Sequence, residues 1–395
     1  NKVWAAGVSG GLWSITNIEN ASSEWTKVSD FWDTLNITSV ATDPTDANII
    51  YIGTGEKRGM GLKGFGVWKT SDGGSTWNQL PSSTDFKWID TIIVRDEGGV
   101  GAVYVGGGRS LSEGEYTGIN GLQKSTDGGA TWTEVLGEIA AGSSHHVTDL
   151  EIDSNNRLIV GTRTNTFGDG GGQIFYSDDG TVFSQYTIGA LGQFDRTFVD
   201  VSPSDPNVLY AMFENASTGY ITWLGKSEDA GLTWTQKSIG LDENGNPFGD
   251  YQGSMDYWGF LGVDPNDTNT IYAAGAQSIH KSTDSGETWT EISEWRGTGF
   301  SLPYVHADHH NIVFIDSDKI LMSNDGGVFL TTDGGNTFTM KNDNMVTTQF
   351  YSTAIHPTDS DYVLGGTQDN GTWRLNTAGK QAGVEVYGGD GGFVH

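Results

Sequence analysis

The stretch KSTDSGETW, from Lys281 to Trp289, is the part of the sequence that decides the fold, because close copies of it recur along the chain. Its pattern is Ser/Thr-x-Asp-x-Gly-x-x-Trp/Phe. An Asp side chain can accept backbone N–H groups across a turn, and Gly permits positive φ, so each copy is expected to form a hairpin turn between two strands. The other copies begin at Thr70, Ser125, Ser227 and Thr331, and a degenerate copy has Tyr176 at the first position.

A second repeated element precedes each turn: an apolar strand, a Pro-Asn or Pro-Asp turn, and another apolar strand. Regular examples are ITSVATDPTDANIIYIGTG from Ile37 and TFVDVSPSDPNVLYAMF from Thr197. Each unit therefore predicts four antiparallel strands, and a spacing of roughly 40 to 60 residues is typical of propeller blades. The remaining units begin at Gly259 and, less regularly, near Ile89, Val147, Asn311 and Tyr351.

The two ends of the chain predict how the ring closes. Residues 2–28 contain three strand-like segments, KVWAAGV, GLWSITN and EWTKVSD, which correspond to a blade without its first strand. The terminal GGFVH, residues 391–395, would supply that strand, which makes residues 1–395 one β-propeller of eight blades. Seven blades is the alternative, because GGFVH begins a further blade if more sequence follows His395.

The composition limits the partners of the protein. Fifty acidic residues against 21 basic ones give a formal charge of −29, which repels nucleic acid and anionic membranes. No apolar run approaches membrane-spanning length, so no membrane insertion is expected. The chain has no cysteine, which excludes a disulfide scaffold and thiol catalysis. The composition suits a protein that handles neutral or cationic ligands, and it leaves the oligomeric state open.

The predicted topology separates the repeated turns from the expected functional face. Turns between third and outer strands lie on one face of the disc, whereas the second-to-third loops and the loops that enter each inner strand lie on the other. Aromatic rings and carboxylates gather on this second face, which suits sugar rings with apolar C–H faces and hydroxyl donors. Candidate catalytic residues are Asp308, Asp325, Asp369 and Asp390, and candidate ligand-binding residues are Glu56, Tyr257, Trp258, His306, His309 and Gln368.

Structural explanations compete with this interpretation. NDGG around Asp325 and QDNG around Asp369 are also good tight-turn sequences. The cluster YVHADHH, Tyr304 to His310, is compatible with either a transition-metal site or a hydrogen-bonded acid–base cluster, although its spacing matches no established metal motif. No cofactor is predicted. Calcium bound in the acidic loops is an open alternative, although the sequence contains no EF-hand-like loop.

Several segments together resemble a known group of proteins: VWAAGVSGGLW, YIGTGE, YVHADHH, NDGGVF, TQFYSTAIHPTD, GGTQDNGTW and GGDGG. They are similar to secreted Asp-box (BNR) repeat proteins of Bacteroidetes, which are often labelled glycoside hydrolase-like or sialidase-like and are commonly exported by type IX secretion. The wider superfamily includes sialidases, xyloglucanases and sortilin-type receptors. The resemblance implies a secreted or cell-surface propeller, and it implies no particular reaction.

Two relatives with defined chemistry can be compared residue by residue. The xyloglucanase pattern places a catalytic Asp in the first second-to-third turn, where GVSGGLWSI has Val8. Sialidases need three arginines; Arg58, Arg109, Arg163 and Arg196 fall on the expected face, but the sialidase Arg-Ile-Pro signature is absent. We therefore expect a carbohydrate-active propeller that binds polysaccharide, with hydrolysis left open. The alternative is a non-catalytic, sortilin-like or adhesin propeller that binds protein.

Overall fold

The computed structural model describes residues 2–56, 62–112, 115–188, 193–250, 253–297, 299–376 and 383–394. Within these ranges the protein is all-β, and its single helical element is the 3-10 turn Pro81–Ser83. None of the helical structure described is long and apolar enough to cross a membrane. The predicted fold class, a β-propeller of four-stranded antiparallel blades, is confirmed by the sheets described below.

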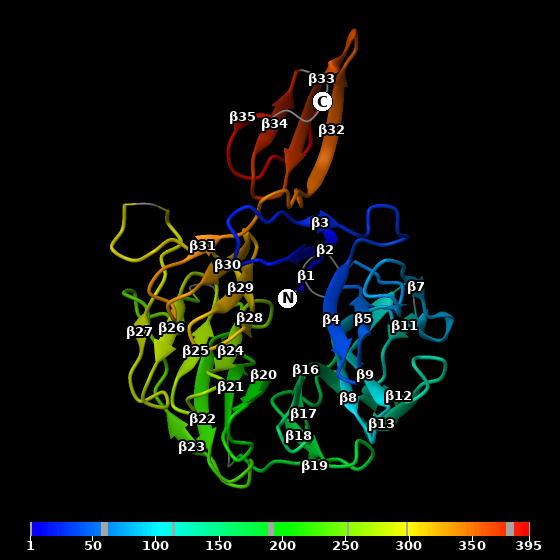
Figure 1. Cartoon of the computed structure of the whole chain (residues 1–395), viewed down its shortest axis with the longest axis vertical. Helices are drawn as coiled ribbons and strands as arrows, with labels where there is room; N and C mark the ends of the chain where they lie inside the picture. Colours follow the sequence, from blue (N-terminus) through cyan, green and yellow to red (C-terminus); the bar gives the residue numbers. More distant parts are fainter. Residues whose placement is uncertain are drawn as a thin grey trace.

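Six four-stranded antiparallel sheets follow one another around a ring (Figure 1). The first three are β4 (Ile37–Asp43), β5 (Asp46–Thr54), β6 (Val67–Thr70) and β7 (Asn78–Gln79); β8 (Ile89–Asp96), β9 (Gly101–Gly107), β12 (Leu122–Ser125) and β13 (Thr133–Leu136); and β16 (His146–Ile152), β17 (Leu158–Arg163), β18 (Ile174–Ser177) and β19 (Ser184–Gln185). The next three are β20 (Phe194–Val201), β21 (Leu209–Asn215), β22 (Ile221–Ser227) and β23 (Thr235–Lys237); β24 (Phe260–Val263), β25 (Ile271–Ala274), β26 (Ile279–Ser282) and β27 (Thr290–Glu291); and β28 (His309–Phe314), β29 (Ile320–Asn324), β30 (Gly327–Thr331) and β31 (Thr339–Met340). Two short ribbons extend the connecting loops: β10 (Arg109–Ser112) with β11 (Glu115–Gly118), and β14 (Glu138–Ala140) with β15 (Ser143–Ser144).

A three-stranded sheet occupies the seventh position of the ring. It consists of β1 (Lys2–Gly7), β2 (Gly11–Thr16) and β3 (Thr26–Lys27), as the N-terminal segments predict. Trp13 and Ile15 pack with Leu321 of β29 on one side. Leu12 packs with Ile52 of β5 on the other side. The ring is therefore closed by side-chain packing on both faces of this sheet.

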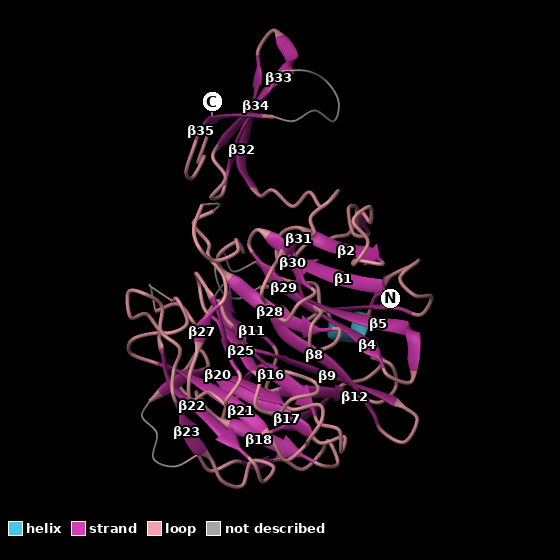
Figure 2. Cartoon of the chain, turned by 60° about the vertical axis from the view of Figure 1, so that its left-hand side comes forward, coloured by secondary structure: helices cyan, strands magenta, loops and turns pink. Residues whose placement is uncertain are grey.

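An eighth sheet stands outside the ring. It consists of β32 (Phe350–His356), β33 (Asp359–Thr367), β34 (Thr372–Leu375) and β35 (Val384–Tyr387), and it projects away from the blades in both views (Figures 1 and 2). None of the hydrophobic core clusters of the described chain includes a residue of these strands. The described residues thus form eight blade-like sheets, of which seven form the ring.

The expected pairing of residues 391–395 with the N-terminal sheet is absent from the described residues. The N–H of Gly391 donates to the carbonyl of Thr367 at 2.8 Å, and the N–H of Val394 donates to Ser352 Oγ at 2.7 Å. Residues 391–394 therefore lie against the eighth sheet, because their backbone finds its partners on β32 and β33. His395 lies outside the described residues.

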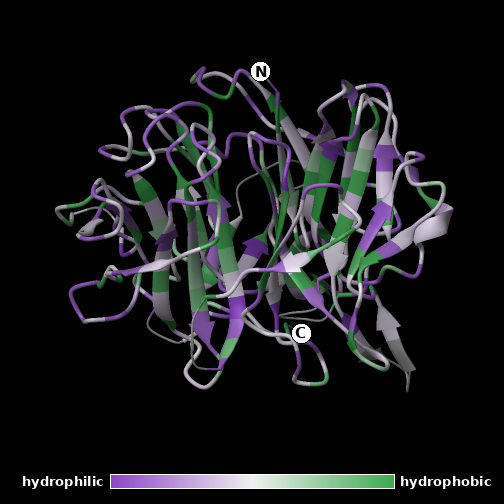
Figure 3. Cartoon of the chain, turned by 90° about the horizontal axis from the view of Figure 1, so that it is seen from below, coloured by the Kyte–Doolittle hydropathy of each residue, from purple (hydrophilic) through white to green (hydrophobic). Residues whose placement is uncertain are grey.

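The repeated turns are held by the Asp and Ser/Thr side chains. Around Asp284, Oδ1 accepts the Thr288 N–H at 2.8 Å and Oδ2 accepts the Thr288 hydroxyl at 2.6 Å, while Ser282 Oγ accepts the Gly286 N–H at 2.8 Å. The Trp289 indole N–H reaches back to the Ser238 carbonyl at 2.9 Å. Seen from below, the hydrophobic residues are concentrated on the strands of the blades, where they alternate with polar ones, and the connecting loops are mostly polar (Figure 3). The Asp284 and Ser282 side chains thus close this turn locally, and Trp289 bonds it to the preceding blade.

Candidate functional site

The candidate site lies at the mouth of the ring, on the face opposite the repeated turns. We call this set of residues the acidic mouth. Most members come from a second-to-third loop or from a segment that enters an inner strand, as the sequence predicts; His310 lies within β28, and Asp390 follows the outer strand β35. The acidic mouth comprises Glu56 after β5, Tyr257 and Trp258 before β24, His306 and Asp308 before β28, His310 in β28, Asp325 after β29, Gln368 and Asp369 after β33, and Asp390 after β35.

Asp308 has the most unusual environment of the four predicted carboxylates. It adopts φ of 62°, and its N–H donates to the Ala276 carbonyl at 2.5 Å. Burial, and after it the nearby Asp325 carboxylate, raises its pKa to about 6, against the opposing effect of His310 and His306. Asp308 can therefore hold a proton near neutral pH, which is the property of a general acid.

Asp325 is tied to a histidine and lies close to an aromatic residue. Its Oδ1 lies 2.7 Å from His310 Nε2, and the ring of Tyr257 stands edge-on to the His310 ring at 5.6 Å. Burial raises the pKa of Tyr257 above its ordinary value, and Glu56, Asp325 and Asp308 contribute in that order. The Tyr257 phenol therefore stays protonated among the carboxylates and remains a hydrogen-bond donor.

Asp369 brings the eighth sheet to the acidic mouth. It has φ of 57°, and its N–H donates to Asp390 Oδ1 at 3.0 Å. Burial raises its pKa, with further increases from Asp390 and Asp325, while His306 lowers it. The carboxylates that follow β35 and β29 thus act electrostatically on Asp369, which follows β33. The neighbouring Gln368 uses its N–H to bond the Gln349 carbonyl at 3.1 Å.

The two predicted histidines have different surroundings. His306 covers the backbone of Gly326, where a Cβ would come within 2.3 Å of the imidazole. His309 is fully buried beneath the mouth, and burial lowers its pKa to about 3. In this structure His309 therefore supports the mouth from below, whereas His306 lies at the level of the carboxylates.

Two arginines hold the aromatic segment in place. Arg163 donates to the Asp256 carbonyl at 2.9 Å and to Asp195 Oδ2 at 3.0 Å. Arg196 donates to the carbonyl of Met255 at 3.2 Å and also contacts the carbonyls of Tyr257 and Trp258. Sequence reasoning placed both arginines on this face but could not show that Arg163 is buried and Arg196 partly buried against the backbone of 255–258, which makes them positioning residues for that segment. Arg58 lies outside the described residues.

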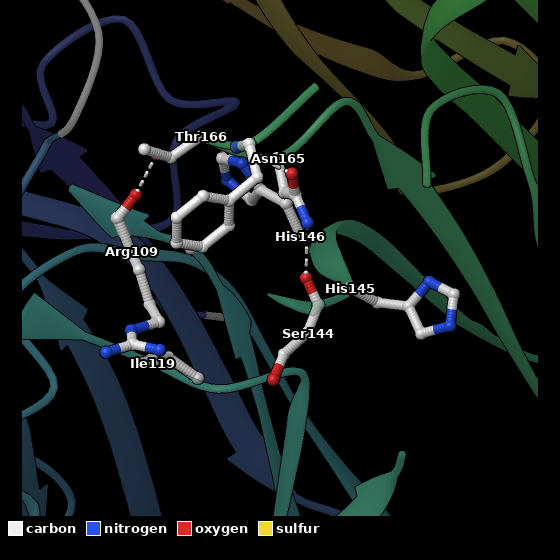
Figure 4. Close-up of a pocket in the computed structure, with 9 residues that line it drawn as sticks. Arg109, Ile119, Ser144, His145, His146, Asn165 and Thr166 are labelled. Carbon is white, nitrogen blue, oxygen red and sulfur yellow. Dashed lines mark hydrogen bonds between the residues drawn. The ribbon is translucent and has the colours of Figure 1, made fainter. Parts of the chain in front are cut away.

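A separate small cavity lies near the β10–β11 ribbon (Figure 4). Its volume is about 10 Å³, room for about one water molecule. It is lined by Arg109, His145, His146 and Asn165 among others, and His146 Nε2 lies 2.5 Å from Asp90 Oδ2. This cavity is too small for a sugar. In the part of the chain that is described, no three His, Asp or Glu side chains are grouped to hold a metal ion.

Comparisons with known proteins agree with the fold. No protein-family model matches the chain. It is 28% identical over 328 residues to a xyloglucanase of Hypocrea jecorina and 26% identical over 309 residues to a xyloglucanase of a Paenibacillus species. These matches cover 72% and 70% of this chain but 36% and 29% of the two relatives, so the chain spans about a third of their length.

Two solved structures support the same conclusion. An ancestral GH74 enzyme is similar with a TM-score of 0.65 at 16% identity, over 95% of this chain and 51% of that one. A YCF48 protein bound to a D1 peptide is similar with a TM-score of 0.52 at 16% identity, over 84% of this chain and 89% of that one. The chain therefore shares the β-propeller fold with both kinds of protein.

Proposed function

We propose that the acidic mouth binds a neutral polysaccharide and hydrolyses its glycosidic bonds. The observation that carries this proposal is the environment of Asp308. Its pKa is about 6, and the carboxylate that acts on it, Asp325, is paired with His310. Two carboxyl groups with different environments are the requirement for glycoside hydrolysis. Asp308 donates its proton to the leaving glycosidic oxygen, and Asp325 accepts a proton from the water that attacks the anomeric carbon.

The aromatic residues around the carboxylates support a sugar ligand. Tyr257 and Trp258 are half-buried and lie 5.9 Å apart in an edge-on arrangement, and Tyr351 is 37% exposed. Rings of this kind stack against the C–H faces of pyranoses, while carboxylates accept hydrogen bonds from the hydroxyls. Glu56 and Gln368 complete the polar lining, and the net charge of −29 favours a neutral glycan over an anionic one.

The similarity to two proteins named xyloglucanases makes xyloglucan the first polysaccharide to test. Xyloglucan is a neutral β-glucan with side branches, and the proposal extends to this substrate class. An extracellular or cell-surface location, which the sequence resemblance implies, belongs to the same proposal because polysaccharides of this kind occur outside cells.

The test is a panel of xyloglucan, unbranched β-glucans and marine polysaccharides, assayed for gel retardation and for new reducing ends in the same samples. We expect retardation and cleavage by the wild-type chain, with cleavage at least about 100-fold slower in Asp308→Asn and Asp325→Asn because each removes one proton-transfer group. Asp361→Asn, an exposed carboxylate at the other end of β33, is the matched control and should keep full activity.

A protein-binding function is the second candidate, and one observation favours it. The eighth sheet exposes large apolar side chains, including Ile355 at 66% and Tyr387 at 75%. Exposed apolar patches on a soluble domain commonly mark interaction surfaces. Absence of both retardation and cleavage over the whole panel would contradict the carbohydrate proposal and favour this one.

A further inference from the structure

The inner strands of three consecutive blades are joined to one another by carboxylates. Asp149 of β16 accepts the backbone N–H of Val199 in β20 on its Oδ2 at 2.8 Å. Asp200 of β20 accepts the backbone N–H of Val263 in β24 on its Oδ2 at 2.7 Å. We call these two hydrogen bonds the carboxylate joints. Both lie on the inner side of the ring, because the inner strands surround its axis (Figure 1).

The corresponding joint between the first two four-stranded blades is made by a hydroxyl. The N–H of Ile92 in β8 donates to Ser39 Oγ of β4 at 3.0 Å. Ser39 and Asp149 occupy the same register, since each follows a bulge and pairs with a glycine of the second strand, Gly53 and Gly161 respectively. An uncharged side chain is thus sufficient for such a bond, and the carboxylate of Asp149 adds a charge that depends on pH.

A third carboxyl group belongs to the same cluster. Glu151 lies two residues beyond Asp149 on β16, so the two side chains are on the same face of the strand. Asp200 adjoins Val199, to which Asp149 is bonded. Burial raises the pKa of Asp149 to about 6 and that of Asp200 to about 7, and it also raises the pKa of Glu151, to which the two aspartates add. The cluster therefore loses its protons only above the ordinary range for carboxylic acids.

Arg196 connects this cluster to the acidic mouth. Its charge lowers the pKa of Asp149, and its guanidinium also contacts the backbone carbonyls of the segment 255–258. Arg196 thus interacts with both the carboxyl group and the segment. β24 carries no ionisable residue. The other ionisable groups at this level of the ring are Asp90 of β8, His146 of β16, Arg163 of β17, Asp195 of β20, Glu214 of β21 and Asp256.

We propose that the carboxylate joints are a pH-sensitive device that sets how firmly Arg196 holds the segment 255–258. While Asp149 is protonated, the Arg196 guanidinium interacts mainly with the backbone carbonyls of this segment. Ionisation of Asp149 draws the guanidinium toward the new carboxylate, and the negative charges on β16 and β20 repel one another. The segment, which carries Tyr257 and Trp258, is therefore held more weakly at alkaline pH.

The expected effect has a definite sign, because the pKa values are raised. A carboxyl group with a raised pKa contributes stability that is complete below its ordinary pKa near 4 and is lost as the pH rises through its folded value. Opening of the segment that returns the pKa of Asp149 from about 6 to near 4 becomes about tenfold more favourable between pH 5 and pH 8. One consequence rests on the proposed function, in which Tyr257 and Trp258 bind sugar: polysaccharide binding weakens over the same pH range.

Amide hydrogen exchange of the wild-type chain tests this device without any polysaccharide. Exchange is read by mass spectrometry on peptides that cover residues 255–258, at pH 5 and pH 8, and is corrected for the intrinsic chemical rate at each pH. We expect the protection of these amides to fall about tenfold from pH 5 to pH 8. Equal protection at the two pH values would overturn the proposal and would leave the proposed function untouched.

Two uncharged variants at one position identify the titrating group. Asp149→Ser copies the hydroxyl joint of Ser39, and Asp149→Asn keeps a side-chain carbonyl as the acceptor, so that one of them can replace the other if it fails to fold at pH 5. Both should lose most of the pH dependence at residues 255–258. Asp361→Asn, which removes an exposed carboxylate of β33, is the control and should keep the wild-type response. A tenfold response that persists in a folded Asp149 variant would overturn the proposal.

Discussion

The two ends of each third strand differ: one end carries the repeated structural turn, and the other end carries a loop on the face of the candidate site. At one end the same turn recurs with the same hydrogen bonds, as around Asp127 and Asp284, each of which accepts from a Thr four residues later. At the other end the loops differ from blade to blade in length and chemistry, and the carboxylates of the acidic mouth converge there. Repetition therefore marks residues that hold the blades together, and irregularity marks the candidate site.

The largest expected effect is a loss of stability on the side of the repeated turns. Gly231 has φ of 87°, and a Cβ at this position would lie 2.4 Å from the Tyr186 ring. Gly231→Ala therefore adds a steric clash to the strain of a left-handed conformation, and we expect a loss of about 3 kcal/mol in the free energy of unfolding. Chemical denaturation measures this value.

Gly99→Ala is the matched control for this substitution. Gly99 has φ of 89°, and nothing lies within 4 Å of an added Cβ. Only the conformational strain remains, and we expect a loss of about 1 kcal/mol. Equal losses at the two positions would show that packing of the turn against the neighbouring blade contributes nothing.

A second prediction concerns acid sensitivity of the repeated turns. Hydrogen bonds from Thr76, Thr131 and Thr288 lower the pKa of Asp72, Asp127 and Asp284, respectively, to about 2. These pKa values lie below the ordinary value near 4. Their contribution to stability is therefore present above pH 4 and is lost as the pH falls toward 2.

Thermal unfolding at pH values between 5 and 2 measures this loss. Asp284→Asn should reduce the dependence of the melting temperature on pH in this window, because one titrating group is removed. An unchanged pH dependence in that variant would show that these hydrogen bonds do not contribute to acid unfolding.

The smallest effect is expected at the acidic mouth and has the opposite sign. The pKa of Asp308 is raised to about 6, so its contribution to stability is complete below pH 4 and is lost as the pH rises through 6. Asp308→Asn should therefore stabilise the protein at pH 8, by about 1 kcal/mol because the carboxyl is partly open to solvent, and should have little effect at pH 4. Melting temperatures of the two proteins at both pH values test this, and destabilisation at pH 8 would contradict it.

Much of the fold could be predicted from sequence because its signals are local. Turn residues and two-residue alternation identify the strands, and the predicted unit starts at Ile37, Ile89 and Val147 fall at or within one residue of the first residues of β4, β8 and β16. Closure of the ring was not predictable in the same way. Phe350–His356 and residues 391–395 both resemble inner strands, and local pattern does not decide which of several equivalent strands fills one position.

The candidate site was predictable as a set of residue types but not as an arrangement. Topology alone places Asp325 and Asp369 at the ends of second strands, and the structure brings both near Asp308. The burial of His309 and Arg163 depends on the packing of neighbouring blades, which the sequence around these residues does not reveal. Electrostatic coupling between the eighth sheet and the ring likewise depends on the path of segment 341–349.

The most direct test of the division between the two faces compares Asp284→Asn with Asp325→Asn in one experiment. Xyloglucan retardation and reducing-end release are measured per folded molecule, together with the melting temperature. The account predicts that Asp284→Asn lowers the melting temperature and keeps binding and cleavage, whereas Asp325→Asn keeps the melting temperature and loses cleavage. Loss of cleavage in folded Asp284→Asn, with full cleavage in Asp325→Asn, would contradict the account.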